Sequence, residues 1–265
     1  MAAVKDVYEA MNRWAPFGIQ MDFDNAGFLV GRGDREVTKI LVALDITLEV
    51  AREAADWGAQ LVVSHHPVIF HPARSITDGD PTGQILLELI EHGVAAVCAH
   101  TNLDAAQGGV NDCLAQALEL KQVGQLHQDG TLPDGSAYGI GRVGVAHTAG
   151  MSAAEYAAYV KQRLGAASVR CVDGGKPVAN VAVGGGSCGS MLEDAVKAGC
   201  DTFVTADVKY DTFLQAKALG INLMDAGHFA TENVVCPSLV RFLAENFPKA
   251  EVRQSQCHRE VYFGV

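Results

Sequence analysis

The sequence predicts an α/β fold of two similar halves that arose by internal duplication, each a mixed, mostly parallel sheet flanked by helices. Val-rich strand patterns alternate with helical patterns of about three turns, which is typical of βαβ units. The order of these patterns in the first half recurs in the second half, which indicates the duplication. With 265 residues, of which 49% are apolar, the chain can bury one large core or the cores of two α/β halves.

The elements of the first half follow from the hydrophobic period. An amphipathic helix is expected in the opening segment MAAVKDVYEAMNRWAPFG. Strand-like and helical runs then alternate as KILVALDIT, TLEVAREAADWG, AQLVVSHH, PTGQILLELIEHG and VAAVCAH. A further helix is expected in GGVNDCLAQALEL, with Asn111 or Asp112 as its N-cap. Because helices separate these strands, we expect most of the strands to be parallel.

The boundary between the halves is expected in residues 121–141. This segment is the least periodic part of the chain, and it contains several glycines, a proline and an Asp-Gly turn signal. We therefore predict a first half over residues 1–125 and a second half over residues 126–265.

The second half repeats the first at one constant offset. Its strand VANVAVGGG, helix SMLEDAVKAG and strand CDTFVTAD align with KILVALD, EVAREAADWG and AQLVVSHH. Gly199 then corresponds to Gly58, and Asp207 corresponds to His66. The next strand, in GINLMDAGHFATE, repeats GVAAVCAHTNLD with one inserted residue. Duplication explains this pattern better than chance does.

Charge and cysteine usage exclude several classes of protein. Against 31 acidic residues, 20 basic ones give a formal net charge of −11, which repels phosphate backbones, so nucleic acid is not the expected partner. The seven cysteines form no C-x-x-C pair, which is typical of a reduced, cytoplasmic protein. No apolar run reaches the roughly 18 residues of a membrane span. We therefore expect a cytoplasmic protein without a membrane partner.

Histidines and carboxylates follow three of the predicted strands. The candidate metal ligands are His65, His66, Asp104, His228 and Glu232. Open α/β sheets bind ligands at the carboxyl ends of their strands, so these side chains are expected to converge there. Imidazole suits Zn, Fe, Mn, Co or Ni, and a carboxylate can bridge two cations. The sequence therefore predicts a centre with two divalent metal ions.

Other residues near these motifs have roles that the sequence leaves open. His100 could brace Asp104, or it could act as an acid/base catalyst near the metal ions. Asp207 and Tyr210 in TADVKY are candidate substrate contacts, although a solvated helix start explains TADVKY about as well. Gly186 is a further candidate, because a Gly-rich turn lets backbone amides approach a phosphate.

Two simpler readings compete with the metal site. A single buried histidine is usually a structural residue, and only the joint pattern favours metal binding. His71, His127, His147 and His258 lack such a pattern and are expected in loops or on the surface. The run GGSCG matches G-x-S-x-G, which would make Ser187 a nucleophile, but a Gly-rich βα turn explains this run better.

Six motifs resemble those of the Nif-three-like family, whose bacterial members are often labelled GTP cyclohydrolase 1 type 2 homologues. The motifs are DNAGFLVG, SHHPVIF, AHTNLDAAQGGVND, VAVGGGSCG, TADVKY and DAGHFATE. The resemblance implies a duplicated α/β fold, two divalent metal ions and a ring-shaped homohexamer. Carried over by position, it assigns His66 and Asp104 to one metal ion. It assigns His65 and His228 to the other, with Glu232 as the bridge.

Together, these observations predict a dinuclear metal-dependent hydrolase that acts on a small, nucleotide-like or phosphorylated substrate. Five protein ligands on two cations would leave coordination positions open, which favours catalysis over a purely structural site. The alternative is a metal-binding regulatory or scaffold protein without turnover. DNA binding would need a basic lining within an acidic chain.

Overall fold

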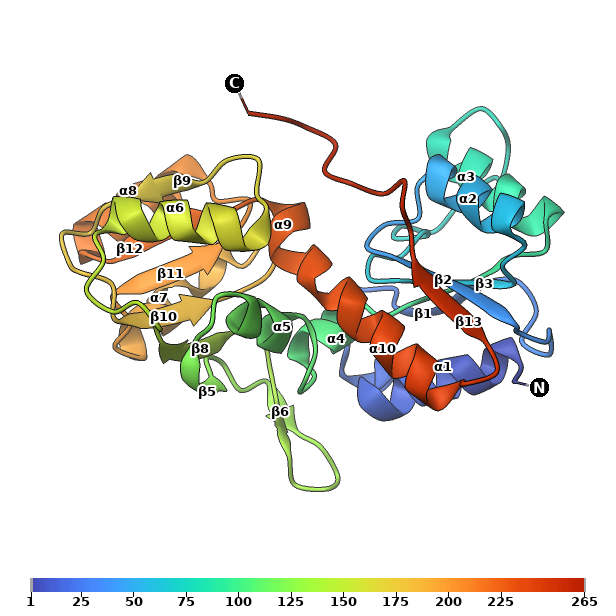
Figure 1. The fold of residues 1–265 in the computed structure, drawn as a ribbon, viewed down its shortest axis with the longest axis horizontal. Coiled ribbons are helices and arrows are strands. Elements are labelled where there is room, and N and C mark those ends of the chain that lie inside the picture. The colour runs from blue at the N-terminus through green and yellow to red at the C-terminus, as the bar shows by residue number, and fades with distance from the viewer. Residues whose placement is uncertain (1, 265) are drawn as a thin grey trace. The chain divides into compact units, whose positions relative to one another are not determined.

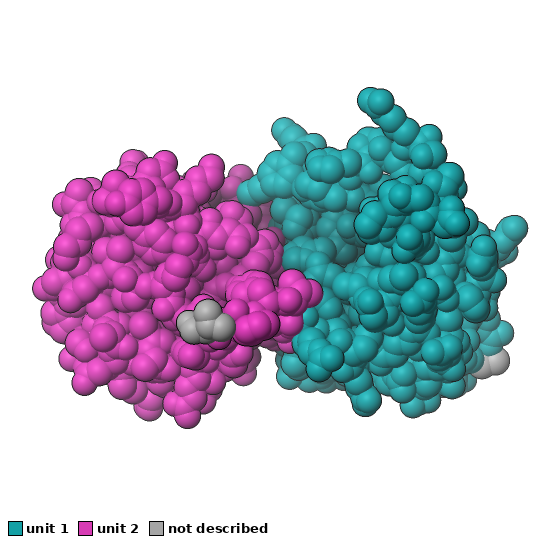
Figure 2. All heavy atoms as spheres, turned by 90° about the horizontal axis from the view of Figure 1, so that it is seen from above, with its two compact units in different colours: residues 1–103, 236–259 teal, residues 104–235, 260–265 magenta. Residues whose placement is uncertain are grey.

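Two larger sheets with flanking helices make up the protein, and the computed structural model describes residues 2–264 (Figure 1). Contacts divide the chain into unit 1, residues 1–103 and 236–259, and unit 2, residues 104–235 and 260–265 (Figure 2). Each unit therefore consists of two separate segments of the chain. The halves 1–125 and 126–265 stay a prediction.

The sheet of unit 1 has the strand order β1-β4-β3-β2-β13. Its strands are β1 (Gly27–Val30), β2 (Lys39–Ala43), β3 (Leu61–Ser64), β4 (Ala95–Cys98) and β13 (Glu251–Gln254). β1 is antiparallel to β4, and the other neighbouring strands are parallel. Every residue of β3 and β4 is buried, as expected for a parallel sheet covered by helices on both faces.

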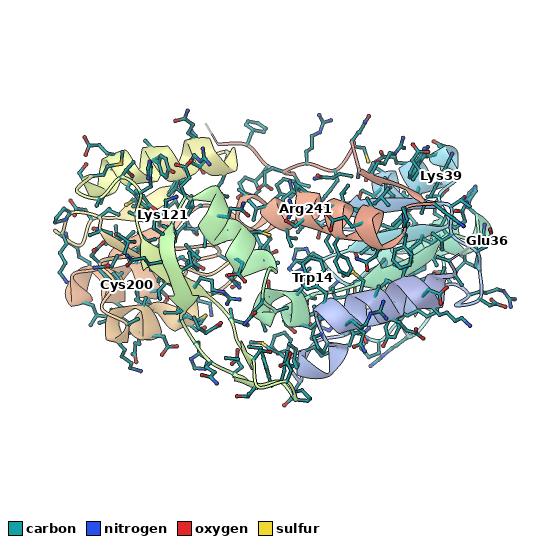
Figure 3. All side chains as sticks on the ribbon, turned by 60° about the horizontal axis from the view of Figure 1, so that its bottom comes forward. Trp14, Glu36, Lys39, Lys121, Cys200 and Arg241 are labelled. Atoms are coloured by element: carbon teal, nitrogen blue, oxygen red, sulfur yellow. The ribbon has the colours of Figure 1, made fainter. Side chains whose placement is uncertain are left out.

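Helices cover both faces of this sheet. The four longer helices are α1 (Val4–Trp14), α2 (Leu48–Trp57), α3 (Pro81–Glu91) and α10 (Cys236–Asn246). α2 and α3 pack on one face, and α1 and α10 pack on the other (Figure 1). Between α1 and α10 lies Trp14 (Figure 3), whose ring centroid is 4.6 Å from that of Phe242. The short helices η1 (Phe17–Ile19) and α4 (Thr101–Ala105) follow α1 and β4.

The sheet of unit 2 has the strand order β5-β8-β10-β11-β12-β9. Its strands are β5 (Lys121–Gln125), β8 (Arg142–Val145), β9 (Arg170–Val172), β10 (Asn180–Val183), β11 (Thr202–Thr205) and β12 (Asn222–Asp225). β10, β11 and β12 are parallel, and the outer pairings are antiparallel. The aperiodic segment 121–141 forms β5 and the hairpin of β6 (Gly130–Thr131) and β7 (Ala137–Tyr138).

Two apolar clusters fix the helices of unit 2 on its sheet. The helices are α5 (Val110–Ala117), α6 (Ala153–Leu164), α7 (Leu192–Lys197), α8 (Tyr210–Leu219) and α9 (His228–Glu232), with η2 (Gly189–Met191) and η3 (Asn233–Val235). Leu114 of α5 and Tyr156 of α6 pack in one cluster with Val181 of β10. Leu192 of α7 packs in the other cluster with Phe203 of β11. The two clusters therefore cover opposite faces of the sheet.

Strand register confirms that the central strands of the two units are arranged in the same way. Ile40 pairs with Leu61 across β2 and β3, and the residues at the same offset, Val181 and Thr202, pair across β10 and β11. Each parallel core also carries an antiparallel edge strand that precedes it in sequence, β1 beside β4 and β9 beside β12. The predicted α/β fold class with two similar halves is thus confirmed.

The predicted N-cap of the helix in GGVNDCLAQALEL is wrong. α5 begins at Val110 with Gly109 as its N-cap, so Asn111 and Asp112 lie inside the first turn. The Asn111 side chain is instead buried in unit 2, and Asp112 accepts hydrogen bonds from the guanidinium of Arg142 at 2.8 and 2.9 Å. Asp112 also accepts from the backbone N–H of Gly108 at 2.7 Å, so it caps the helix start from inside the first turn and not from the N-cap position. No helix within residues 2–264 is long and apolar enough to span a bilayer.

Candidate metal centre

Three imidazoles of unit 1 gather at the carboxyl ends of β3 and β4. His65 and His66 follow β3 directly, and His100 lies two residues beyond β4. The ring centroids of His65 and His66 are 4.9 Å apart, and His100 lies 5.2 Å and 5.4 Å from them. One ring nitrogen of each histidine lies within 4.8 Å of the other two, so the three could hold a metal ion. Neighbouring parallel strands end at the same edge, which brings together residues that are distant in sequence.

Hydrogen bonds at Nδ1 fix the orientation of the first two rings. The Nδ1 of His65 donates to the carbonyl of Ala99 at 2.8 Å, and the Nδ1 of His66 donates to Asp45 Oδ1 at 2.6 Å. The other oxygen of Asp45 lies 3.0 Å from Nε2 of His258, whose side chain is only 6% exposed. Burial raises the pKa of Asp45. Its hydrogen bonds with His258 and His66 lower the pKa by more than burial raises it, so the pKa lies well below its usual range. With Nδ1 donating, each of the two rings carries its lone pair on Nε2.

His100 is oriented by a carboxylate in the same way. Its Nδ1 lies 2.7 Å from Asp24 Oδ1, while Asp24 Oδ2 accepts from the backbone N–H and the hydroxyl of Thr101 at 3.0 and 2.5 Å. Burial raises the pKa of Asp24, but these hydrogen bonds outweigh it and bring the pKa to about 2. Asp24 is therefore an ionised acceptor at neutral pH, and His100 also carries its lone pair on Nε2.

Unit 2 supplies one further imidazole and two carboxylates. His228 and Glu232 lie one turn apart on α9, which begins at His228, and His228 Nε2 is 3.0 Å from Glu232 Oε2. His228 Nδ1 lies 2.6 Å from Asp207 Oδ2. The second carboxylate belongs to Asp104 on α4, and both Asp104 and Glu232 are buried. A buried carboxylate is costly unless hydrogen bonds or a cation compensate its charge.

The Gly-rich turn after β10 leaves room for the Glu232 carboxylate. Gly186 has a left-handed φ of 64°, and a Cβ at this position would collide with Glu232 Oε1 and lie 3.1 Å from His228 Nε2. The backbone N–H of Gly186 donates to Thr231 Oγ1 at 3.0 Å. Only glycine fits this position, because its backbone forms the wall against which the two α9 side chains lie.

Asn111 connects the Asp104 segment to the same turn. Its side-chain amide donates to the backbone carbonyl of Asp104 at 3.0 Å, and its side-chain oxygen accepts from the N–H of Gly185 at 2.9 Å. Asn111 is fully buried, so both hydrogen bonds are shielded from water. This amide therefore holds the segment that bears Asp104 in a defined place within unit 2.

The three candidate substrate contacts occupy different surroundings. Asp207 has a φ of 52°, a strained value for a non-glycine residue, and its carboxylate orients His228. Tyr210, the first residue of α8, is 77% exposed. Gly186 faces the Glu232 carboxylate. Their contact with a substrate stays a prediction.

Ser187 does not have the surroundings of a nucleophile. The residue is exposed, and within residues 2–264 its hydroxyl makes no hydrogen bond to a histidine. A nucleophilic serine needs a base within hydrogen-bond reach. The structure therefore favours the interpretation of GGSCG as a βα turn.

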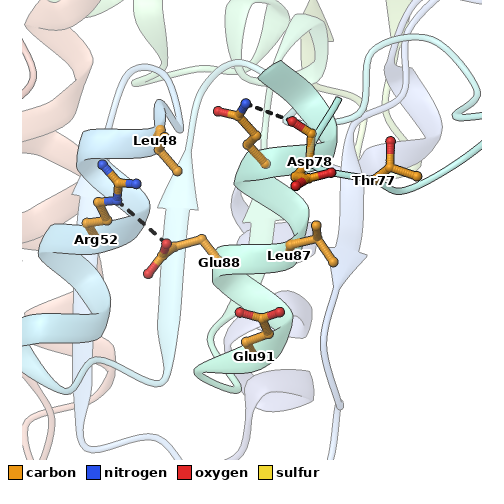
Figure 4. A pocket seen from close by; sticks show the side chains of 8 residues that line it. Leu48, Arg52, Thr77, Asp78, Leu87, Glu88 and Glu91 are labelled. Atoms are coloured by element: carbon orange, nitrogen blue, oxygen red, sulfur yellow. Dashed lines mark hydrogen bonds and ion pairs between the residues drawn. The ribbon is translucent and has the colours of Figure 1, made fainter. Parts of the chain in front are cut away.

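A separate groove of unit 1 lies between α2 and α3 and has a cavity volume of about 610 Å³ (Figure 4). It is lined by Leu48, Arg52, Thr77, Asp78, Gln84, Leu87, Glu88 and Glu91. Arg52 and Glu88 face each other across it at 3.6 Å. None of the predicted site residues lines this groove.

The profile of the Duf34/NIF3 family, described as NGG1p interacting factor 3, matches residues 2–260. The chain belongs to this family. It is similar to a Clostridium perfringens protein named GTP cyclohydrolase 1 type 2 homolog, with 35% identity over 86% of each chain. A Helicobacter pylori protein named GTP cyclohydrolase 1 type 2 is 33% identical over 88% of each chain. The solved structure of a hypothetical protein from Staphylococcus aureus matches with a TM-score of 0.92, 29% identity and 99% of each chain covered.

In this Duf34/NIF3 protein, sequence reasoning missed the residues that orient the histidines. Asp24 lies in the DNAGFLVG motif and Asp45 follows the strand KILVA, so both stood close to a recognised signal. His258, expected on the surface or in a loop, lies in the loop after β13, but its side chain is buried against Asp45. No local pattern marks His258, because its contact spans 213 residues of sequence.

Proposed function

We propose that this Duf34/NIF3 protein is a metal-dependent hydrolase that acts on a small, nucleotide-like or phosphorylated substrate. The observation that carries the proposal is the common orientation of four histidines. His65, His66, His100 and His228 each engage an oxygen through Nδ1. A histidine that donates through Nδ1 to a carbonyl or carboxylate presents a basic Nε2, which is the usual arrangement of a metal ligand.

The proposed centre contains two divalent ions, as the family resemblance implies. His66 and Asp104 would bind one ion, His65 and His228 the other, and Glu232 would bridge them. Imidazole and carboxylate together suit Zn, Fe, Mn, Co or Ni, and the set contains no cysteine ligand. Cations held there would supply Lewis-acid catalysis and lower the pKa of water, which is what hydrolysis requires.

The residues around the ligands have distinct proposed tasks. Asp207 orients His228 through Nδ1. Asp24 orients His100 through Nδ1 in the same way, which leaves Nε2 of His100 as the atom that could exchange a proton with substrate. The backbone of Gly186 and the exposed ring of Tyr210 are the proposed substrate contacts. The names of the relatives in Clostridium perfringens and Helicobacter pylori point to purine nucleotides as the first substrates to test.

Metal analysis combined with a hydrolysis screen tests this proposal. Protein purified without added metal and then reloaded should bind about two equivalents per chain and hydrolyse one class among nucleotides, phosphoesters and cyclic amides. Glu232→Gln should lower kcat/KM at least about 100-fold, because it removes the bridging charge. Glu193→Gln, at an exposed position on α7, is the matched control and should leave kcat/KM unchanged.

The alternative is a metal-binding regulatory or scaffold protein. Two tightly bound ions without turnover on any substrate class would favour it. A Glu232→Gln variant that loses turnover but keeps its oligomeric state and any partner binding would favour the hydrolase instead. We also propose a ring-shaped homohexamer, on the family resemblance alone. Light scattering coupled to size-exclusion chromatography gives the number of chains in the oligomer. A monomeric mass would contradict the ring.

A further inference from the structure

We propose that Phe23 and Phe70 form an aromatic corner in unit 1, which stacks against the planar base of a nucleotide substrate beside the candidate metal centre. The inference rests on the proposed function and narrows its substrate class to compounds that carry an aromatic heterocycle. Neither residue is a candidate metal ligand. Three observations carry the inference: the exposure of the two rings, their contact with each other and the contact of Phe70 with His100.

Both rings are accessible from solution although they are large and apolar. Phe23 is 64% exposed and Phe70 is 38% exposed. Their ring centroids lie 6.5 Å apart, with an angle of 66° between the ring planes. One exposed aromatic side chain is ordinary on a protein surface, but two that contact each other beside a cluster of polar groups are typical of a ligand-binding surface.

Phe70 connects this pair to the candidate metal centre. Its ring centroid lies 6.0 Å from that of His100, with the ring planes at 80°. Phe70 ends the run SHHPVIF, which also carries the two adjacent histidines. Phe23 directly precedes Asp24, whose carboxylate orients His100. The aromatic corner is therefore continuous with the carboxyl edge of the sheet, where open α/β sheets bind their ligands.

Hydrogen bonds fix the backbone on both sides of Phe23. The backbone N–H of Met21 donates to Thr101 Oγ1 at 2.9 Å. On the other side, Asp24 accepts from the backbone N–H and the hydroxyl of Thr101. The loop is thus held by its backbone and by neighbouring polar side chains. The ring of Phe23 is not needed for that purpose and remains available to a ligand.

The loop that bears Phe70 is fixed in a similar way. Val68 and Ile69 pack against the apolar cluster between the sheet and helices α2 and α3. The side-chain amide of Asn25 donates to the carbonyl of Ile69, which joins this loop to the loop of Phe23. Aromatic side chains have only two χ angles, so a pair on fixed loops loses little conformational entropy when a ligand binds.

The angle between the two rings suits a planar aromatic guest. Aromatic rings prefer offset-stacked or edge-to-face contacts, and the corner offers a guest one of each kind. A base stacked on Phe23 would meet the edge of Phe70. Every nucleobase has a π-face, so such stacking recognises that a base is present and not which base it is. A sugar phosphate without a base gains nothing from these rings.

Calorimetric titration of the full-length, metal-loaded chain with two matched probes tests the inference. GMP and ribose 5-phosphate share the sugar and the phosphate, but only GMP carries a base. The unmodified chain should bind GMP roughly 5- to 100-fold more tightly, which is the contribution of stacking on one aromatic side chain. Phe23→Ala should remove this preference, and Phe70→Ala should reduce it. Affinity for ribose 5-phosphate should stay the same in both variants.

Two further variants control the experiment. Phe23→Trp should keep the preference for GMP, and its indole emission should fall when GMP is added but not when ribose 5-phosphate is added. Ile90→Ala is the matched control, because Ile90 is a 52% exposed apolar residue of α3 that precedes the opposite end of β4. It should leave both affinities unchanged. Because Phe23 is largely exposed, its variants should fold, and they decide the inference even if Phe70→Ala does not fold.

The outcomes separate the inference from the proposed function. The inference is overturned if the unmodified chain binds both probes equally or binds neither. It is also overturned if Phe23→Ala keeps full GMP affinity, or loses affinity for both probes alike. Unchanged GMP affinity together with a lower oligomer mass in Phe23→Ala would identify the two rings as a contact between copies of the chain.

Turnover distinguishes the two proposals further. If a phosphoester without an aromatic ring is hydrolysed with the same kcat/KM by the unmodified chain and by Phe23→Ala, the hydrolase stands and the aromatic corner is refuted. If GMP binding depends on Phe23 but no compound of any class is hydrolysed, the aromatic corner is supported and the hydrolase is refuted.

Discussion

The two units share the register of their central strands, but they differ in the residues that follow these strands. Asp45, after β2, corresponds to Gly186, after β10, and His66, after β3, corresponds to Asp207, after β11. In unit 1 the carboxylate of Asp45 orients His66, whereas in unit 2 the carboxylate of Asp207 orients His228. Both Asp–His contacts measure 2.6 Å.

This difference shows how one duplicated scaffold gives two kinds of donor set. Unit 1 offers three imidazoles and keeps its carboxylates behind them. Unit 2 has a glycine where unit 1 has Asp45, and the freed space holds the Glu232 side chain, which is itself a candidate ligand.

The largest effect is expected from a side chain placed at Gly186, where unit 2 differs from unit 1. Gly186→Ala places a Cβ against Glu232 Oε1 at a left-handed φ of 64°, so the carboxylate must move away from the ligand position. We expect metal affinity to fall about 10- to 100-fold and unfolding free energy to fall by about 1–3 kcal/mol. Zinc competition titration and urea denaturation measure the two effects.

Gly199→Ala is the matched control for Gly186→Ala. Gly199 also has a positive φ, 76°, but a Cβ there meets nothing within 4 Å. Gly199→Ala should lower the unfolding free energy by about 1 kcal/mol through backbone strain alone and should leave metal affinity unchanged. Equal losses of affinity in both variants would show that Gly186 acts only through its backbone conformation.

A smaller effect is expected at a support that only unit 1 has. His258 contacts the oxygen of Asp45 that does not face His66. It follows β13, an edge strand that is parallel to β2. In unit 2 the strand at the corresponding position, β8, is antiparallel to β10. His258→Gln should weaken cobalt binding about tenfold, because Asp45 loses one of the contacts that hold it. His92→Gln, at an exposed histidine bonded to its own helix, should leave binding unchanged. Unchanged affinity in His258→Gln would show that Asp45 alone orients His66.

Sequence pattern sufficed for the α/β scaffold, whereas the metal-ligand roles of His65, His66, Asp104, His228 and Glu232 stay a prediction. Strand and helix periods are local features of the sequence. The repeat in AQLVVSHH and CDTFVTAD predicts that these two strands end at equivalent positions. The N-cap predicted at Asn111 failed because the amide of this residue bonds Asp104 and Gly185, partners that no local rule can anticipate. Sequence periodicity predicts which residues reach the sheet edge, but tertiary folding decides which side chains meet there.

The same limit explains the missed residues around the histidines and the pairing of the last strand with the sheet of unit 1. β13 pairs with β2 although more than 200 residues separate them, which returns residues 236–259 to unit 1. Asp24 comes from a loop before β1 and meets His100 only because β1 pairs with β4. Such contacts depend on strand order, which hydrophobic period does not encode.

The smallest expected effect concerns the pH dependence of unit 1. Because hydrogen bonds with His100 and Thr101 bring the pKa of Asp24 to about 2, from an ordinary 3.8, its carboxylate stabilises the fold above pH 4. This contribution is lost as pH falls from 4 towards 2. In metal-free protein at pH 7, Asp24→Asn should lower the unfolding free energy by about 1–2 kcal/mol, and the difference from the unmodified chain should shrink below pH 4. Urea denaturation from pH 7 to pH 3 measures it, with Asp22→Asn at the exposed neighbour as control. A difference that stays constant down to pH 3 would mean that the Asp24 carboxylate stabilises unit 1 through its shape and not through its charge.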